Sequence, residues 1–325
     1  MIFRTEIVLP TAPHLLDYQQ QVFTTGSCFA ASLGHRLQLN KFSVTNTPFG
    51  TVYNPVSIHR QILDALGGQD LAEDDFFTHQ GQWRNVQYHS SFNDLNQENV
   101  SNKIRHAWQI ARQSLHHADW LIITYGTAFV YELTSNGRIV ANCQKLPSAW
   151  FQKRLLTPTE IVASFDELIT HLRRLRAQVN ILVTLSPVRH VRDSLTLNQV
   201  SKSVVRYALH QIVEKHTRVS YFPSYEIVLD DLRDYRFYES DLIHPNQSAL
   251  EYIWEKFCDA YLTAETKATL ARWQSIAAEL QHRAFDPDAK ANKQRLEKLH
   301  QQLLHLRGVL PVENEIDEIA KQINS

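Results

Sequence analysis

The amino-acid sequence predicts an α/β protein, a three-layer α/β/α sandwich built on a parallel sheet, with a helical extension at the C-terminus. Residues 120–127 and 179–185 are short, mostly apolar runs of the kind found in buried parallel strands. Strand-like and helix-like segments alternate in the order β-α-β-α-β-α-β-α, which implies right-handed crossovers and helices on both faces of the sheet. After about residue 263 the composition shifts to Ala, Gln, Glu, Lys and Arg, which predicts the extension.

In the first half of the chain, β-branched and aromatic runs alternate with segments of helical periodicity. Prolines and glycines mark the ends of these segments and predict a loop over residues 47–55. Strands are expected at residues 3–9, 22–25, 41–46 and 120–127, helices near 29–37 and over 56–66 and 99–117, and a hairpin within 76–92.

The second half continues the alternation up to about residue 262. Thr157, Pro158 and Glu160 predict a helix start, with Thr at the N-cap, Pro at the first position and Glu in the first turn. Helices are expected over residues 158–175, 200–216, 225–232 and 250–262, strands at 179–185 and 219–222, and a hairpin within 129–142.

We divide the chain into a sheet domain, residues 1–262, and a helical extension, residues 263–325. The extension is expected to hold helices over 264–283, 288–306 and 315–323, the first two flanking Phe285-Asp286-Pro287. Leucines recur at helical spacing, so the extension could pack on the sheet domain, recruit a partner or pair with a second copy of the chain as a homo-oligomer. These leucines are Leu296, Leu299, Leu303 and Leu306.

Composition excludes several classes of partner. The 325 residues include 33 Lys and Arg against 34 Asp and Glu, so no net field would attract nucleic acid or an anionic membrane.

The three cysteines are Cys28, Cys143 and Cys258. Their spacing fits neither a disulfide framework nor a zinc site, so we expect reduced thiols, the last two packed in the interior. Without a phosphate loop, dinucleotide fingerprint, metal cluster, signal peptide or transmembrane run, we expect no cofactor, no metal and a cytoplasmic protein.

Residues 21–33 predict a strand, a tight turn at Gly26, and a helix. This arrangement puts Ser27 and Cys28 at the carboxyl end of a strand and at the first N–H groups of a helix. Open α/β sheets bind ligands at that edge, and a helix N-terminus favours negative charge, so nucleophilic chemistry is one reading. The other reading is structural: a serine N-cap followed by an ordinary buried cysteine.

A second group of reactive side chains lies in residues 241–246, Asp-Leu-Ile-His-Pro-Asn. Pro245 keeps His244 out of helical geometry, which predicts that Asp241 and His244 lie on the loop before the last helix of the sheet domain. An aspartate three residues before a histidine can orient that imidazole as a general base toward a nucleophile on another loop. The alternative is an N-cap beside a surface histidine.

Residues 26–30, Gly-Ser-Cys-Phe-Ala, are identical to the signature of the GSCFA-domain family, and several later segments resemble that family in the same order. Those segments fall within residues 49–55, 126–131, 142–147, 186–190, 221–226 and 234–238. The blocks at 26–28, 126–127 and 241–246 are also similar to those of the SGNH (GDSL-like) hydrolases. This resemblance implies a flavodoxin-like fold and an acyl-enzyme mechanism, with His244 as base and Asp241 orienting it.

The resemblance leaves two positions open. Overlaying the Gly-Asp-Ser of SGNH hydrolases on residues 26–28 puts Cys28 at the nucleophile, whereas a one-residue shift of the turn presents Ser27. Gly50 could supply an oxyanion-hole N–H, but Ala128 stands where those enzymes have an asparagine donor, a loss typically worth about 2.7–4 kcal/mol. The candidates to replace that donor are Thr127, Asn54, His89 and Arg189, and His190 is a further candidate substrate contact.

The resemblance and the two motifs together predict an acyl-ester or thioester hydrolase, or an acyltransferase, acting on a small molecule or a glycan. The competing prediction is a catalytically degenerate scaffold that binds a small molecule or a carbohydrate. Ala128 favours the binding protein, whereas Asp241 and His244 together with two candidate nucleophiles favour the enzyme.

Overall fold

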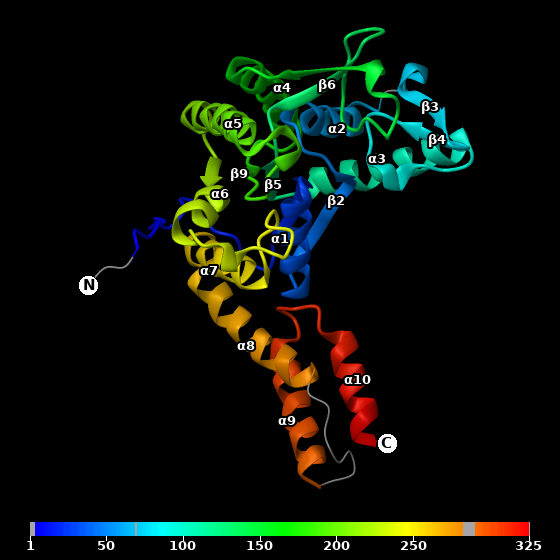
Figure 1. Ribbon diagram of the computed structural model, residues 1–325. Helices are drawn as coiled ribbons and strands as arrows, with labels where there is room; N and C mark the ends of the chain where they lie inside the picture. Colours follow the sequence, from blue (N-terminus) through cyan, green and yellow to red (C-terminus); the bar gives the residue numbers. More distant parts are fainter. Residues whose placement is uncertain (1–3, 69, 282–289, 325) are drawn as a thin grey trace.

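The computed structural model describes residues 4–68, 70–281 and 290–324 (Figure 1). Its centre is a five-stranded sheet in the order β10-β9-β5-β1-β2, with every pair parallel. The strands are β1 (Gln21–Gly26), β2 (Ser43–Thr51), β5 (Trp120–Tyr125), β9 (Asn180–Leu185) and β10 (Val219–Phe222). Counted along the chain, this is the doubly wound order 2-1-3-4-5, which reverses direction between β1 and β5.

Helices cover both faces of the sheet, which confirms the predicted three-layer α/β/α architecture. One face packs against α1 (Cys28–Leu39) and α7 (Gln247–Tyr261). The other packs against α2 (Pro55–Gly67), α3 (Gln97–His117), α4 (Pro158–Leu175) and α5 (Leu195–Lys215). Val22 and Phe23 are adjacent on β1 and lie in different core clusters, because successive side chains of a strand point to opposite faces.

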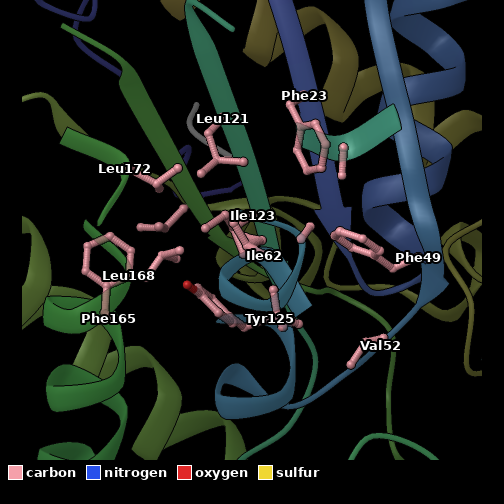
Figure 2. Packing of buried hydrophobic residues seen from close by; sticks show 14 of the residues in the cluster. Phe23, Phe49, Val52, Ile62, Leu121, Ile123, Tyr125, Phe165, Leu168 and Leu172 are labelled. Carbon is pink, nitrogen blue, oxygen red and sulfur yellow. The ribbon is translucent and has the colours of Figure 1, made fainter. Parts of the chain in front are cut away.

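Figure 2 shows the core on the second face. Phe23 and Phe49, from neighbouring strands, have ring centroids 6.3 Å apart. Farther along the sheet, Leu121 and Ile123 of β5 face the α4 side chains Phe165 and Leu168. The opening helix, the apolar strands and the Thr157 capping box are present as predicted.

A small antiparallel sheet and a hairpin lie beyond the carboxyl edge of the main sheet. The sheet has the order β7-β6-β8 and the hairpin pairs β3 with β4. Their bounds are β3 (Phe76–His79), β4 (Gln82–Asn85), β6 (Phe129–Leu133), β7 (Ile139–Val140) and β8 (Phe151–Leu155). Sequence periodicity predicted both hairpins but missed β8. Short helices are Glu73–Asp75, Ser90–Phe92, Ser148–Trp150, Val191–Asp193, Tyr235–Phe237, α6 (Ser224–Glu226) and the π-helical turn Ile227–Asp231.

Two expectations about strands are wrong. Residues 4–9 form no strand; Ile7 instead donates its N–H to Asp231 Oδ1 at 2.8 Å, and Phe3 lies outside the described residues. The predicted loop at 47–55 is strand up to Thr51, because β2 is an edge strand and such strands tolerate Pro48. Its irregularity appears as a register shift between Thr24 and Gly26 of β1.

The described part of the extension consists of α8 (Ala264–Gln281), α9 (Lys290–Leu306) and α10 (Glu313–Asn324), near the three predicted helices. The four leucines of α9 are buried within the extension, against Trp273 of α8 and Ile316 of α10. The predicted Phe285-Asp286-Pro287 break lies outside the described residues, and self-association stays a prediction. None of the described helices combines the length and apolar composition needed to cross a membrane.

The extension meets the sheet domain at the turn between α1 and β2. Trp273 Nε1 donates to Leu39 O at 2.9 Å, and Lys41 Nζ lies 2.6 Å from Glu315 Oε1. This turn leads into the amino end of β2, so the extension docks on the side of the sheet opposite the strands' carboxyl ends. In Figure 1 the extension projects away from the sheet domain.

A buried histidine in this core makes stability depend on pH. His59 is fully buried between Tyr125 Oη (2.7 Å from Nε2) and Ser164 Oγ (2.8 Å from Nδ1), and burial lowers its pKa from 6.5 to about 3. At a pH between 6.5 and about 3, His59 is protonated in the unfolded chain and neutral in the folded chain. The free energy of unfolding therefore falls as the pH falls through this range.

Between pH 7 and pH 5 we expect the titration of His59 to lower the free energy of unfolding by about 2 kcal/mol. Urea unfolding at both pH values should show this fall, and His59→Gln should reduce it by that amount because glutamine does not titrate. An equal fall in the wild-type protein and in the variant would contradict the assignment.

Candidate active site

The site is built around the turn after β1, at the point where the strand order reverses. Gly26 ends β1 with φ +122°, Ser27 is the N-cap of α1 and Cys28 is its first residue. A Cβ on Gly26 would lie 2.1 Å from the carbonyl oxygen of Thr124 on β5, so only glycine fits this turn. The turn therefore places Cys28 at the carboxyl edge of the sheet, where doubly wound folds bind their ligands.

The two candidate nucleophiles have different surroundings. Ser27 is 1% exposed, and within the described chain its Oγ is buried without a hydrogen-bond partner. Cys28 is half-buried. Burial raises the pKa of its thiol, and the backbone N–H groups of Phe29 and Cys28 and the charge of Lys202 oppose that rise. The thiol is thus protonated at neutral pH and needs a base to become a nucleophile.

Asp241 and His244 form a hydrogen-bonded pair on the loop before α7. Oδ1 of Asp241 accepts the N–H groups of Ile243 (2.8 Å) and His244 (3.0 Å), and Oδ2 lies 2.7 Å from His244 Nδ1. The backbone N–H and side chain of His244 lower the pKa of Asp241 to about 2. An ionised carboxylate only accepts hydrogen bonds, so Nδ1 carries the proton and Nε2 of the neutral ring is the basic atom.

Arg189 supports this loop. Its backbone N–H donates to Ile243 O at 3.3 Å, and its guanidinium donates to Tyr238 Oη at 2.8 Å and to Leu242 O at 3.4 Å. The guanidinium also stacks over the Tyr238 ring, 4.1 Å from its centroid. Arg189, an oxyanion candidate by sequence, is thus engaged in holding the Asp241–His244 loop.

The other candidate oxyanion donors accept hydrogen bonds from nearby backbone N–H groups, which leaves their own N–H or O–H groups as donors. Asn54 caps α2, accepting from Ser57 N at 2.8 Å. Thr127 Oγ1 accepts the N–H of Phe129 at 3.0 Å, and His89 Nδ1 accepts the N–H of Ser91 at 3.2 Å.

Gly50 and Ala128 are the two remaining positions that the sequence analysis linked to an oxyanion hole. Gly50 has φ +73°, and a Cβ there would lie 2.6 Å from Cβ of His89, so close packing requires the glycine. Ala128 is fully buried, and its N–H donates to Ser201 Oγ at 2.7 Å. Neither the side chain nor the N–H of Ala128 replaces the missing asparagine.

His190 lies between the sheet edge and a cleft. Its Nε2 would be 3.2 Å from a Cβ on Gly126, and its ring meets Tyr53 edge-on with centroids 5.6 Å apart. Burial, together with the charge of Lys202, lowers the pKa of His190 to about 4, so the ring is neutral at pH 7. Arg189, the residue before His190, donates its backbone N–H to Ile243 O at 3.3 Å, which joins this segment to the Asp241–His244 loop.

The cleft has a volume of about 620 Å³ and opens over the small β7-β6-β8 sheet. Aromatic rings and a few charged groups line it, including Tyr53, Phe129, Tyr131, Phe151, His190 and Arg192. Lys153 and Asp193 form an ion pair at its edge. Among the described residues, no group of three or more His, Cys, Asp or Glu side chains is arranged to hold a metal ion.

Comparison with protein-family models decides the family. Residues 21–257 match the GSCFA family, and residues 273–325 match the family described as GSCFA domain protein, C-terminal domain. The chain belongs to the GSCFA family.

Two further comparisons add little to this assignment. A solved structure described as "a putative platelet activating factor from Streptococcus pneumonia" is similar over 78% of this chain and 84% of its own, at 10% identity and a TM-score of 0.39. A search of curated proteins finds no significant match. Family membership therefore rests on the family models.

In this GSCFA protein the first half of α5 holds the site's loops together. Asn198 Oδ1 accepts the N–H of His190 at 2.9 Å, Ser201 Oγ accepts from Ala128, and Lys202 Nζ donates to Ser186 O at 2.6 Å. All three side chains are buried. Sequence reasoning missed them, although their i, i+3, i+4 spacing continues the apolar face of α5 and could have indicated burial.

Proposed function

We propose that this GSCFA protein is an SGNH-like hydrolase or acyltransferase that passes an acyl group through a thioester on Cys28. One observation carries the proposal: the carboxyl edge of the sheet bears a half-buried cysteine at a helix N-terminus and an imidazole oriented by a carboxylate. The resemblance of residues 26–28 and 241–246 to SGNH hydrolases supports the same reaction. The cleft beside His190 is the proposed site for the acyl substrate.

Cys28 is the proposed nucleophile. Ser27 Oγ is buried in the turn, so it would reach a substrate only if the N-cap unwound. Cys28 as a residue is half-buried rather than fully buried, and its sulfur lies beside N–H groups that stabilise its thiolate.

The proposed reaction has two steps that use His244 in turn. Nε2 of His244 takes the thiol proton, the sulfur forms a bond to the acyl carbonyl carbon, and the bond from that carbon to the leaving oxygen or sulfur breaks. The leaving group takes the proton from His244. Water or an acceptor hydroxyl then gives its proton to Nε2 and its oxygen forms a bond to the thioester carbon. The bond from that carbon to sulfur breaks, the acyl group leaves on the new oxygen, and Nε2 returns the proton to the Cys28 sulfur. Asp241 stabilises the imidazolium in both steps.

Peptide-mapped mass spectrometry after brief exposure to an activated acyl ester at neutral pH tests the proposal. We expect one acyl adduct on Cys28, its near-complete loss in His244→Ala, and unchanged labelling in Ser27→Ala. Cys143→Ala is the matched control because Cys143 is another half-buried thiol, on the cleft wall. Labelling of neither Cys28 nor Ser27 above a denatured control would reject the acyl-enzyme.

Ala128 favours a second function, a binding protein that retains the scaffold without turnover. The buried Ala128 gives no donor to an oxyanion, and the lost stabilisation of about 2.7–4 kcal/mol would slow acyl transfer severely. The aromatic rings of the cleft could instead stack on a sugar. Calorimetric binding of oligosaccharides by a protein whose Cys28 stays unlabelled would support this function.

A further inference from the structure

The cleft over the small β7-β6-β8 sheet carries positive charge that the mechanism above does not use. Lys145 and Arg192 line this cleft, together with the carboxylate of Asp193. Lys153 lies at its edge, with Nζ 4.2 Å from the centroid of the Phe129 ring, which also lines the cleft. Among the described residues, cations thus outnumber anions at the cleft, although the whole chain has a net charge of −1.

Asp193 neutralises only one of these cations. Its carboxylate forms the ion pair with Lys153. Within the described chain, no carboxylate forms an ion pair with Lys145 or Arg192, and both side chains are exposed. The His190 ring on the same wall adds no charge at pH 7, because burial lowers its pKa to about 4. Lys145 and Arg192 are therefore free to pair with an anion that enters the cleft.

Lys145 lies on a loop whose shape depends on its neighbour Gln144. Both residues have positive φ, +55° at Gln144 and +58° at Lys145, which residues with a side chain adopt only where the surroundings impose it. The buried Gln144 amide donates to Asn85 O at 2.9 Å and to Tyr88 O at 2.7 Å. Arg84 donates to the backbone carbonyl of Gln144. Backbone strain held in place in this way is concentrated at ligand-binding and active sites.

Arg192 reaches the cleft from a different part of the chain. It lies in the short helix Val191–Asp193 after β9. Just before this helix, the backbone N–H of His190 donates to Oδ1 of the buried Asn198 at 2.9 Å. The last residue of the helix forms the ion pair with β8 described above. Two separately anchored segments therefore bring Lys145 and Arg192 to one cavity.

Much of the remaining lining is apolar and aromatic. It includes the side chains of Tyr53, Phe129, Tyr131, Leu146 and Phe151. Ligand sites commonly combine an apolar wall with a few polar groups that orient the ligand. A cleft of about 620 Å³ with this lining has room for an apolar group against the rings and for an anion at the two cations.

We propose that the cleft binds a substrate that combines an apolar portion with an anionic group, and that Lys145 and Arg192 select for the anion. The apolar portion contacts the aromatic rings, and carboxylate or phosphate oxygens accept hydrogen bonds from the two cations. The inference rests on the proposed function only for the ligand's being an acyl donor to Cys28. Binding in the cleft does not require acyl transfer and can be measured alone.

Calorimetric titration with three probes that share one ring system tests the proposal. The probes are naphthoate, naphthyl phosphate and the uncharged naphthamide, all substituted at the same ring carbon. We expect the wild-type protein to bind the preferred anion about 10-fold more tightly than the amide, because each exposed cation contributes modestly. The preferred anion then shows whether the substrate carries a carboxylate or a phosphate.

Variants of the two cations and a protection experiment locate the binding. In Lys145→Gln and in Arg192→Gln we expect the affinity for the anions to fall about 3-fold, and in the double variant about 10-fold, with the amide unchanged. Arg105→Gln is the matched control, because it removes an exposed cation from α3 outside the cleft lining. Saturating naphthoate should also slow alkylation of Cys143, on the cleft wall, by iodoacetamide.

Three results would each overturn the inference. One is that neither anion binds more tightly than the amide, which includes no binding of any probe at millimolar concentration. Another is an anion preference that persists in the double variant or falls equally in Arg105→Gln. The third is unchanged alkylation of Cys143 at saturating naphthoate, because the anion would then bind elsewhere.

The two proposals fail in different ways. Anion binding that depends on Lys145 and Arg192, without acyl labelling of Cys28, supports the anion site and rejects acyl transfer. Acyl labelling of Cys28 in a protein that binds the anions no better than the amide supports acyl transfer and rejects the anion site.

Discussion

Replacing Gly26 with alanine is expected to lower the free energy of unfolding by roughly 3–5 kcal/mol. The new Cβ would lie 2.1 Å from the carbonyl oxygen and 2.9 Å from the carbonyl carbon of Thr124, and Gly26 also has φ +122°. Those atoms are backbone of a central strand, and the same oxygen accepts the N–H of Ser27 at 3.0 Å. Relief of the clash would therefore separate β1 from β5 or break the turn that carries Cys28.

Urea unfolding of Gly26→Ala beside Gly137→Ala measures this effect. Gly137 also has positive φ, +68°, but a Cβ there meets nothing within 4 Å, so its cost should be only about 1–2 kcal/mol for the backbone conformation. Losses of equal size at the two glycines would show that the contact with Thr124 is relieved at little cost.

The local pattern around Gly26 is strong, and so this part of the fold was predictable. An apolar and β-branched run, a glycine, and then helical periodicity specify strand, turn and helix within 20 residues. The pairing order of the strands is different, because no sequence pattern states that β1 lies between β2 and β5. The general preference for short, right-handed crossovers reduces the number of possible strand orders, but it does not specify one order.

The wrong strand predictions fall on segments whose structure depends on where they lie in the folded sheet. Pro48 and Gly50 normally end a strand, yet both lie inside β2, because β2 is an edge strand with one unpaired side. Residues 4–9 also have strand composition, but β10 and β2 are the edges of the described sheet, and Ile7 of this segment donates its N–H to the Asp231 side chain instead of pairing with a strand.

In the candidate site, too, local motifs indicated some residues, whereas others depend on tertiary packing. Motifs located Cys28, Asp241 and His244, because these residues lie at turns with a distinctive local sequence. Lys202 was missed because a lysine within a helix usually points to solvent. Its burial depends on the loops after β5 and β9, which the first half of α5 holds in place.

Asp241→Asn is expected to slow formation of the acyl-enzyme roughly 10³- to 10⁴-fold with the fold retained. The asparagine oxygen can still accept the N–H groups of Ile243 and His244, so the loop keeps its shape. The amide nitrogen, however, replaces Oδ2, which lies 2.7 Å from His244 Nδ1, and it donates where the carboxylate accepted. Nδ1 then becomes the acceptor, the ring proton moves to Nε2, and His244 can no longer take the proton of Cys28.

The rate of Cys28 labelling by an activated ester, measured by mass spectrometry, gives this result directly. Asp234→Asn is the matched control: Asp234 Oδ1 accepts the N–H of Arg236 at 2.9 Å in a neighbouring turn and touches no imidazole, so the rate should be unchanged. A variant Asp241→Asn that labels at the wild-type rate would mean that His244 is not the base. The thiolate would then form without that imidazole, and the backbone N–H groups of Phe29 and Cys28 at the start of α1 would be its remaining local stabilisation.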